Sequence, residues 1–248
     1  MTPEHHATQF VLPIWFDLTA TLLFAVTGAW IAIRKGYDYV GVFFLALVAG
    51  VGGGLMRDVI FIAKGPPAAV QDSRYLVAVA VGALFGVMSF RRGSSFERLF
   101  AAVDALGLGV YAVVGAQKAL DVGLQPAAAL IAGVSNAAGG GILRDLLVRS
   151  EPIVFQPGQF YVLAALAGCA AFVVMRVWLE VWAEPAAFIA ITLTFGLRLL
   201  AIRFNWRTRA ASQRWGPQTT ALDDGLVEPV KSDPKTDTLG TPAKNDGL

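Results

Sequence analysis

One seven-residue pattern occurs twice in this sequence. The run 52–58 reads GGGLMRD and returns as GGGILRD at 139–145, an offset of 87 positions, with five of the seven residues identical. The same offset aligns further identical pairs, which are Asp17 and Asp104, Gly28 and Gly115, Gly36 and Gly123, and Met88 and Met175. We infer an internal duplication, so the fold must contain two similar halves.

Seven apolar segments, separated by short charged loops, indicate a chain that crosses a membrane several times. Charged residues make up 15% of the chain, whereas soluble domains carry about 25%. A helix needs about 20 residues to cross the hydrocarbon core, so the short third segment is expected to extend into its loops. The predicted spans are 14–33, 39–63, 75–90, 99–117, 126–148, 160–179 and 186–203.

The repeat and the spans together predict an inverted architecture. Each copy holds three spans, and because three is odd, the second copy enters the membrane from the opposite side. We therefore predict an all-α polytopic membrane protein with two inverted three-helix repeats and a seventh helix, a 3+3+1 plan. The parts are repeat 1 (14–90), a cytoplasmic loop (91–98), repeat 2 (99–179) and the seventh helix (186–203).

Basic residues predict the orientation in a cell (inner) membrane, because Lys and Arg gather in cytoplasmic loops. They favour an extracytoplasmic N-terminus (1–13) and a cytoplasmic C-terminus. The first span has no Lys or Arg before it and two after it, the reverse of a secretory signal peptide, so cleavage is not expected. The polar segment 204–248 is predicted to be a disordered cytoplasmic tail.

The two glycine triplets allow two interpretations. Glycine destabilises a helix interior by about 1 kcal/mol relative to alanine, so three in succession need a reason. One reason is close helix packing; the other is a kink or break that exposes carbonyls to a water-filled path. Packing does not need three adjacent glycines, so we favour the kink. The residues are Gly52, Gly53 and Gly54 on the second span and Gly139, Gly140 and Gly141 on the fifth.

Ionisable residues follow both triplets inside apolar segments, where charge is expensive and indicates function. A purely structural ion pair is the alternative interpretation. The topology predicts one acid–base–acid cluster near the outer face and its repeat near the inner face. We predict that Asp17 pairs with Arg57 and that Asp104 pairs with Arg144. The residues concerned are Asp17, Arg57 and Asp58 in the first cluster and Asp104, Arg144 and Asp145 in the second.

A few further polar residues could line a path between the clusters. Ser135 and Asn136 precede the second triplet, and Thr19, Tyr111 and Lys118 lie on or at the end of other spans. Threonine and serine also commonly bond to the backbone of their own helix, so a structural role is equally compatible with them.

Enzymatic and nucleic-acid functions have little support. No hydrolase, metalloprotease or phosphate-loop motif occurs, so we expect no catalytic residue, cofactor or metal site. One cysteine excludes an internal disulfide or a cysteine-based zinc site. The net charge is only +2, which gives no electrostatic support for nucleic-acid binding.

The doubled GGGxxRD motif in a 3+3+1 pattern resembles the prokaryotic branch of the trimeric intracellular cation (TRIC) channel family. Related bacterial sequences also carry a glycine transporter domain name. The resemblance covers residues 14 to about 203. It implies a homotrimer with one hourglass pore per protomer, glycine-triplet kinks on the second and fifth helices, and conduction of potassium with some sodium. Animal members carry a Lys-Glu-Val motif linked to lipid binding, which this sequence lacks, so lipid regulation of that form is not expected.

Three functions remain open, namely a passive cation channel, a secondary transporter of a small solute such as glycine, and a structural membrane subunit. Inverted repeats suit channels and transporters alike. The middle of the membrane offers mostly glycine with Ser135 and Asn136, which favours the channel. Cation selectivity then requires the four aspartates to outweigh Arg57 and Arg144, or each arginine to be held in a pair.

Overall fold

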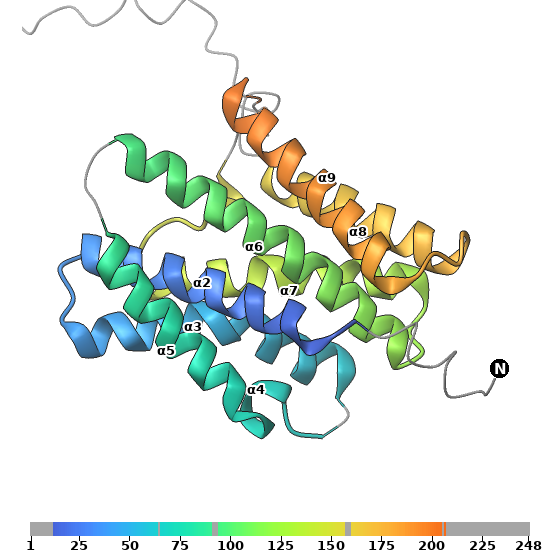
Figure 1. Ribbon diagram of the computed structural model, residues 1–248, viewed down its shortest axis with the longest axis horizontal. Coiled ribbons are helices and arrows are strands. Elements are labelled where there is room, and N and C mark those ends of the chain that lie inside the picture. Colours follow the sequence, from blue (N-terminus) through green and yellow to red (C-terminus); the bar gives the residue numbers. More distant parts are fainter. Residues whose placement is uncertain (1–11, 64, 91–93, 157–159, 205, 207–248) are drawn as a thin grey trace, which may run out of the picture. The chain divides into compact units, whose positions relative to one another are not determined.

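Each of the seven predicted spans forms a helix. The computed structural model describes residues 12–63, 65–90, 94–156, 160–204 and 206. The long helices are α2 (Ile14–Arg34), α3 (Tyr39–Arg57), α5 (Ser73–Ser89), α6 (Ser94–Asp121), α7 (Pro126–Leu147), α8 (Tyr161–Val177) and α9 (Ala183–Arg203) (Figure 1). Three short elements join them: the π-helix η1 (Asp58–Ile62), α4 (Ala68–Gln71) and the 3₁₀ helix η2 (Ile153–Phe155). The predicted N-terminal segment 1–13 and tail 204–248 lie almost entirely outside the described residues.

Two helix boundaries differ from the predicted ones. The third span extends by two residues at its start and ends one residue earlier: α5 has 17 residues and starts directly after Asp72, whose carboxylate caps it by accepting from Arg74 N at 2.9 Å. Hydrogen bonds from Arg74 also hold the pKa of Asp72 below its ordinary value. The loop predicted over 91–98 is shorter, because α6 already begins at Ser94. Phe96 anchors this extra turn, since its ring packs edge-on against Trp30 with centroids 5.3 Å apart.

Helix packing inside the two repeats is equivalent. A Cβ placed on Gly28 of α2 would lie 2.8 Å from the Ala49 Cβ of α3, and one on Gly115 of α6 would lie 2.7 Å from the Asn136 Cβ of α7. Both members of the second pair follow those of the first by 87 positions. The duplication therefore conserves the crossing of the first two helices in each half.

The two halves meet at residues that are themselves repeat equivalents. Phe24 of α2 and Tyr111 of α6 are 87 positions apart, and their rings stack with centroids 5.3 Å apart. Contact between equivalent residues places the pseudo-two-fold axis between them. In Figure 1, α2, α3 and α5 lie on one flank, α8 and α9 lie on the other, and α6 and α7 lie between them.

The seventh helix, α9, packs on the second repeat. A Cβ on Gly168 of α8 would overlap the Thr194 hydroxyl of α9, and one on Gly109 of α6 would lie 3.3 Å from the Thr194 Cβ. Two glycines thus let α9 approach α6 and α8 closely. This contact has no counterpart in the first repeat.

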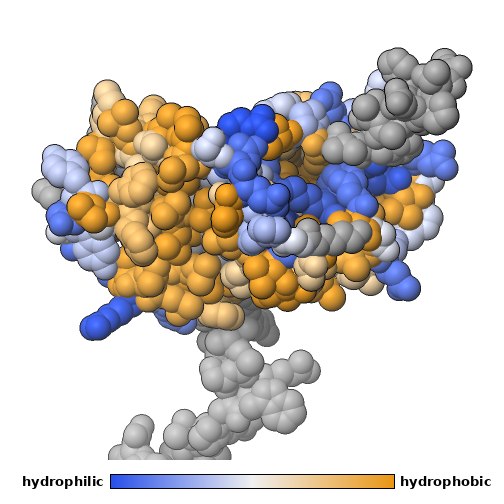
Figure 2. Space-filling view, turned by 90° about the horizontal axis from the view of Figure 1, so that it is seen from below, coloured by the Kyte–Doolittle hydropathy of each residue, from blue (hydrophilic) through white to orange (hydrophobic). Residues whose placement is uncertain are grey.

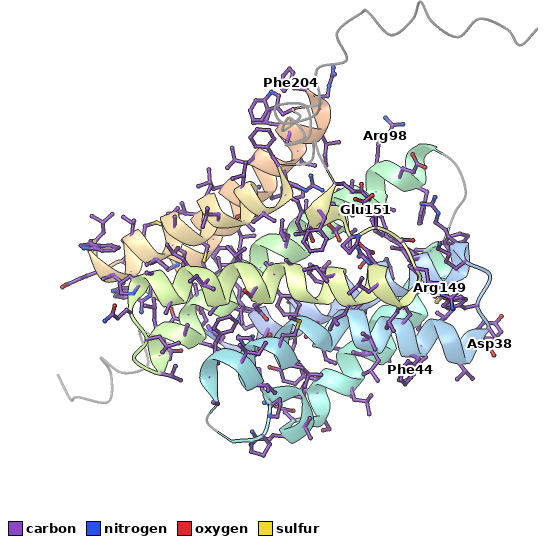
Figure 3. All side chains as sticks on the ribbon, turned by 180° about the vertical axis from the view of Figure 1, so that it is seen from behind. Asp38, Phe44, Arg98, Arg149, Glu151 and Phe204 are labelled. Atoms are coloured by element: carbon purple, nitrogen blue, oxygen red, sulfur yellow. The ribbon has the colours of Figure 1, made fainter. Side chains whose placement is uncertain are left out.

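The outer surface is that of a multi-pass membrane protein. Figure 2 shows a broad apolar face interrupted by a hydrophilic patch. Exposed tryptophans lie at helix ends, with Trp15 at the start of α2, Trp178 and Trp182 between α8 and α9, and Trp206 after α9, as expected for aromatic belts at membrane interfaces. Asp38, Arg98, Arg149 and Glu151 gather toward one end of the helices (Figure 3).

Candidate functional site

The first charge cluster joins the start of α2 to the end of α3. Asp17 accepts at its Oδ2 from Tyr75 Oη at 2.7 Å and from Lys118 Nζ at 2.6 Å. The Arg57 Nη2 atom lies 3.5 Å from the same oxygen, and Arg57 Nε donates to Asp58 Oδ1 at 2.7 Å. We name Asp17, Arg57, Asp58, Tyr75 and Lys118 the Asp17 cluster. The predicted Asp17–Arg57 ion pair is present, and Lys118 joins it from the second repeat.

The local backbone explains how Arg57 and Asp58 reach their partners. The α-helix ends at Arg57 and continues as the π-helix η1 from Asp58. Asp58 Oδ2 accepts from Ala68 N at 2.9 Å, which ties the following loop to the cluster. A Cβ on Gly54 would lie 3.6 Å from Arg57 Nη2. The guanidinium group therefore folds back along its own helix, over the third position of the triplet.

The second charge cluster repeats this chemistry on α6 and α7. Arg144 Nη1 lies 3.2 Å from Asp104 Oδ1, and Arg144 Nε donates to Asp145 Oδ1 at 2.9 Å. Arg144 Nη1 also donates to Thr27 Oγ1 at 2.9 Å. The predicted Asp104–Arg144 ion pair is therefore present as well. We name Asp104, Arg144, Asp145, Thr27 and Arg198 the Asp104 cluster, and Arg198 is described next.

Sequence reasoning missed Arg198. This residue of α9 is 3% exposed, and its Cζ lies 4.8 Å from the centre of the Tyr161 ring. A Cβ on Gly141 would lie 3.4 Å from the Tyr161 hydroxyl and 3.7 Å from Arg144 Nη2, so Tyr161 lies beside the cluster. The signal was available, because an arginine inside the apolar segment 186–203 is as expensive as one beside a glycine triplet. It was overlooked because the seventh helix lies outside the repeat.

The glycine triplets pack against each other rather than breaking their helices. The α-helical assignment runs through Gly52–Gly54 and through Gly139–Gly141 without interruption. A Cβ on Gly53 would overlap the Asn136 carbonyl oxygen, and one on Gly140 would overlap the Ala49 carbonyl oxygen. The helices are therefore not broken at these positions, and the missing side chains allow α3 and α7 to cross in close contact. A kink at the triplets stays a prediction.

A hydroxyl network fills the space beside this crossing. Tyr111 Oη donates to the Gly50 carbonyl oxygen, and the Thr21 hydroxyl lies 2.9 Å from the Tyr111 hydroxyl. Asn136 Nδ2 donates to the Tyr111 carbonyl oxygen at 2.7 Å. Tyr111 and Asn136 thus take the central places predicted for them. Two other predicted path residues do not join this network, because Thr19 is exposed on α2 and Ser135 is only partly buried.

Open space borders the Asp17 cluster. One cavity of about 430 Å³ and a second of about 240 Å³ share Ala68, Lys118 and Asp121 in their walls. Asp17 and Tyr75 line the larger cavity, and Asp58 lines the smaller. The side chains of both clusters are themselves buried: Asp104, Arg144, Asp145 and Arg198 are at most 4% exposed, and Asp17 and Arg57 are at most 3% exposed. The two clusters therefore share their chemistry and their burial.

The clusters lie at two depths along the same helices. Asp17 and Thr27 each mark one cluster on α2, and ten residues of α-helix span about 15 Å. Between them lie the stacked Phe24 and Tyr111 rings, both at most 1% exposed. Among the described residues, no group of three His, Cys, Asp or Glu side chains could hold a metal ion.

The sequence matches a family model and individual bacterial membrane proteins. The family model described as Glycine transporter matches residues 14–91 and 101–177. A UPF0126 membrane protein of Deinococcus radiodurans is 35% identical over 196 residues, which cover 79% of this chain and 86% of the relative. The UPF0126 inner membrane protein YadS of Escherichia coli K12 is 31% identical over 196 residues, which cover 79% of this chain and 94% of the relative.

Solved structures match over a similar extent. A TRIC trimeric intracellular cation channel orthologue from Rhodobacter sphaeroides is 34% identical, with a TM-score of 0.71 over 77% of this chain and 97% of that one. A second TRIC cation channel is 27% identical, with a TM-score of 0.66 over 81% of this chain and 97% of that one. Both similarities cover nearly the whole of the solved chains.

Proposed function

We propose that this chain, which belongs to the family of prokaryotic TRIC channels and UPF0126 membrane proteins, is a cation channel. In finer terms it conducts monovalent cations, potassium with some sodium, as a homotrimer with one pore in each protomer. The support is similarity to TRIC cation channels over nearly their whole length. The chain acts without enzymatic chemistry, cofactor or metal, and its partners are its own copies, membrane lipids and the permeant ions.

One observation carries the proposal: two equivalent charge clusters lie at the two ends of a centre built from repeat-related contacts. In each cluster one arginine is held by two carboxylates, at Arg57 and at Arg144. The arginines are thereby restrained, while carboxylate oxygens remain available. Asp17 Oδ1, for example, has no hydrogen-bond partner among the described residues. Such oxygens can replace part of the water shell of a passing cation.

The glycine triplets shape the path in this proposal through the α3–α7 crossing. Gly53 and Gly140 hold the two helices in contact, and the rings of Phe24 and Tyr111 fill the space next to them. In this arrangement the centre of the proposed path is closed. Conduction requires α3 and α7 to separate, with kinks at the triplets as the means by which they do so.

Orientation in the cell (inner) membrane follows the distribution of basic residues. The Asp17 cluster belongs to the outer mouth and the Asp104 cluster to the cytoplasmic mouth, with the N-terminus outside. The support is that Arg98 and Arg149 lie toward the same end of the molecule (Figure 3), as basic residues at the cytoplasmic side of a membrane would.

The test is purified protein in planar bilayers with a potassium chloride gradient, beside protein-free bilayers as the control. We expect discrete unitary currents that reverse near the potassium equilibrium potential, shifted only slightly when sodium replaces potassium on one side. Silent bilayers together with saturable glycine uptake into proteoliposomes would replace the channel by a transporter. Currents that reverse near the chloride potential would contradict cation selectivity.

A further inference from the structure

We propose that Arg198 of α9 sets the charge balance of the Asp104 cluster and thereby limits cation flux and selectivity at that mouth. The inference rests on the proposed channel function and adds a specificity-determining residue to it. Because α9 lies outside the repeat, this residue has no counterpart at the Asp17 cluster.

The position of Arg198 is fixed by packing. Its side chain is 3% exposed and its guanidinium lies over the Tyr161 ring at 4.8 Å. One turn earlier on α9, Thr194 is clamped against Gly168 of α8 and Gly109 of α6. A cation stacked on an aromatic face within a tightly packed helix cannot swing away when the neighbouring cluster opens.

The buried charges of the two clusters differ by this one group. In the Asp104 cluster, Asp104 and Asp145 stand against Arg144 and Arg198, so two carboxylates meet two guanidinium groups and no net charge remains. In the Asp17 cluster, Asp17 and Asp58 stand against Arg57 alone among the fully buried residues. The balancing charge there is Lys118, whose flexible side chain is 30% exposed and borders both cavities.

A fixed charge beside a narrow path acts strongly on passing ions. Low-dielectric walls focus its field, and mobile salt screens it only where solvent reaches it. A cation that passes Asp104 and Asp145 is attracted by both, repelled by Arg144, which is bound to them, and repelled again by Arg198. Removing Arg198 leaves this mouth with net negative charge and raises the local cation concentration.

The experiment compares wild type with Arg198→Gln, Arg198→Met and Arg198→Lys in planar bilayers at low and high potassium chloride. At about 0.01 M salt, where the Debye length is about 30 Å, we expect each neutral variant to raise unitary potassium conductance about two- to threefold. The reversal potential in a potassium chloride gradient moves closer to the potassium value. At about 1 M salt, where the Debye length is about 3 Å, the difference shrinks toward none. Arg198→Lys keeps the charge and keeps wild-type selectivity.

Gly196→Ala is the matched control on the same helix, because a Cβ there meets nothing within 4 Å. It is expected to match wild type at both salt concentrations. The inference is overturned if the neutral variants leave selectivity unchanged, if their effect is independent of salt, or if Arg198→Lys changes selectivity as they do. It is also overturned if only Arg198→Lys assembles, since the charge would then serve folding. A wild type without potassium current would instead overturn the channel proposal itself.

Discussion

The Asp17 and Asp104 clusters are built from the same motif and yet differ in the residue that supplies their fourth charge. Each has an arginine bound by two aspartates at the end of a glycine-bearing helix. The Asp17 cluster opens on two cavities and takes its fourth charge from the partly exposed Lys118. The Asp104 cluster takes its fourth charge from the buried Arg198.

The difference shows where the symmetry of a duplicated protein is broken. Duplication copied the residues that bind within one repeat. It did not copy what touches the cluster from outside the repeat. Lys118 reaches Asp17 from the other half, and Arg198 joins the second cluster from α9, which lies outside both repeats. The two proposed mouths therefore differ because of contacts between the repeats and with α9, and not because of the motif itself.

Loss of an arginine should have the largest effect and should be larger in the Asp104 cluster. Removing one partner of a buried ion pair costs about 3–5 kcal/mol. We expect Arg144→Met to destabilise more than Arg57→Met, because Asp17 keeps Lys118 and Tyr75 as partners whereas Arg144 binds Asp104, Asp145 and Thr27 together. Thermal unfolding of the detergent-purified protein, followed by size-exclusion chromatography, measures both. Equal losses would remove the distinction between the clusters.

Charge exchange tests the pairing directly. Asp104→Arg alone should abolish folded protein, and the double variant Asp104→Arg with Arg144→Asp should recover part of it. The same exchange at Asp17 and Arg57 should recover more, since Lys118 and the cavities tolerate rearrangement there. Failure of both double variants to recover any folded protein would show that the pairs depend on geometry that charge alone does not supply.

Adjacent glycines should respond with opposite signs. Gly53→Ala and Gly140→Ala place a methyl group against a carbonyl oxygen of the facing helix and should cost about 1–3 kcal/mol of stability. Gly54→Ala and Gly141→Ala meet atoms at 3.6 and 3.4 Å, and should be neutral or stabilise by up to about 1 kcal/mol. Melting temperatures of the four variants decide this. Unitary conductance should change with the first two variants, and a loss of stability in all four would point to helix flexibility instead of packing.

Removing the Tyr111 hydroxyl should have a moderate effect. Tyr111→Phe deletes the donor to the Gly50 carbonyl oxygen and the contact with Thr21, and one hydrogen bond contributes about 0.5–1.5 kcal/mol. The variant also makes the centre more symmetric, because the equivalent residue is Phe24. Its stability and its conductance should be compared with those of Thr19→Val, an exposed change on α2 expected to have no effect. An unchanged Tyr111→Phe would show that ring stacking alone holds the centre.

Loss of Lys118 should have the smallest effect on stability. Its side chain is 30% exposed, so water and salt screen its attraction to Asp17, and exposed pairs contribute about 0–1 kcal/mol. Lys118→Gln should increase potassium conductance at low salt less than Arg198→Gln does, when both are measured in the same bilayers. A larger effect of Lys118→Gln would place the limiting charge at the cavity side of the molecule.

The sequence alone determined the fold class, the family and the residues of both ion pairs. Apolar segments of membrane-spanning length fixed the seven helices, because an unpaired backbone cannot cross a lipid bilayer. The 87-residue offset fixed the repeat, and charges inside apolar segments identified Arg57 and Arg144 because such charges are expensive there. These inferences depend on local composition and spacing, which a sequence contains in full.

The tertiary structure alone decided how the parts meet. Neither spacing nor composition shows that Gly53 lies on the Asn136 carbonyl, because two helices choose their contact face by mutual packing. Lys118 could be noticed but not paired with Asp17, 101 positions away, and Arg198 gained meaning only when α9 docked beside Tyr161. That the helices run unbroken through the glycines and pack closely there was decided in the same way. The absence of side chains allows either outcome, and only the neighbouring helix determines which one occurs.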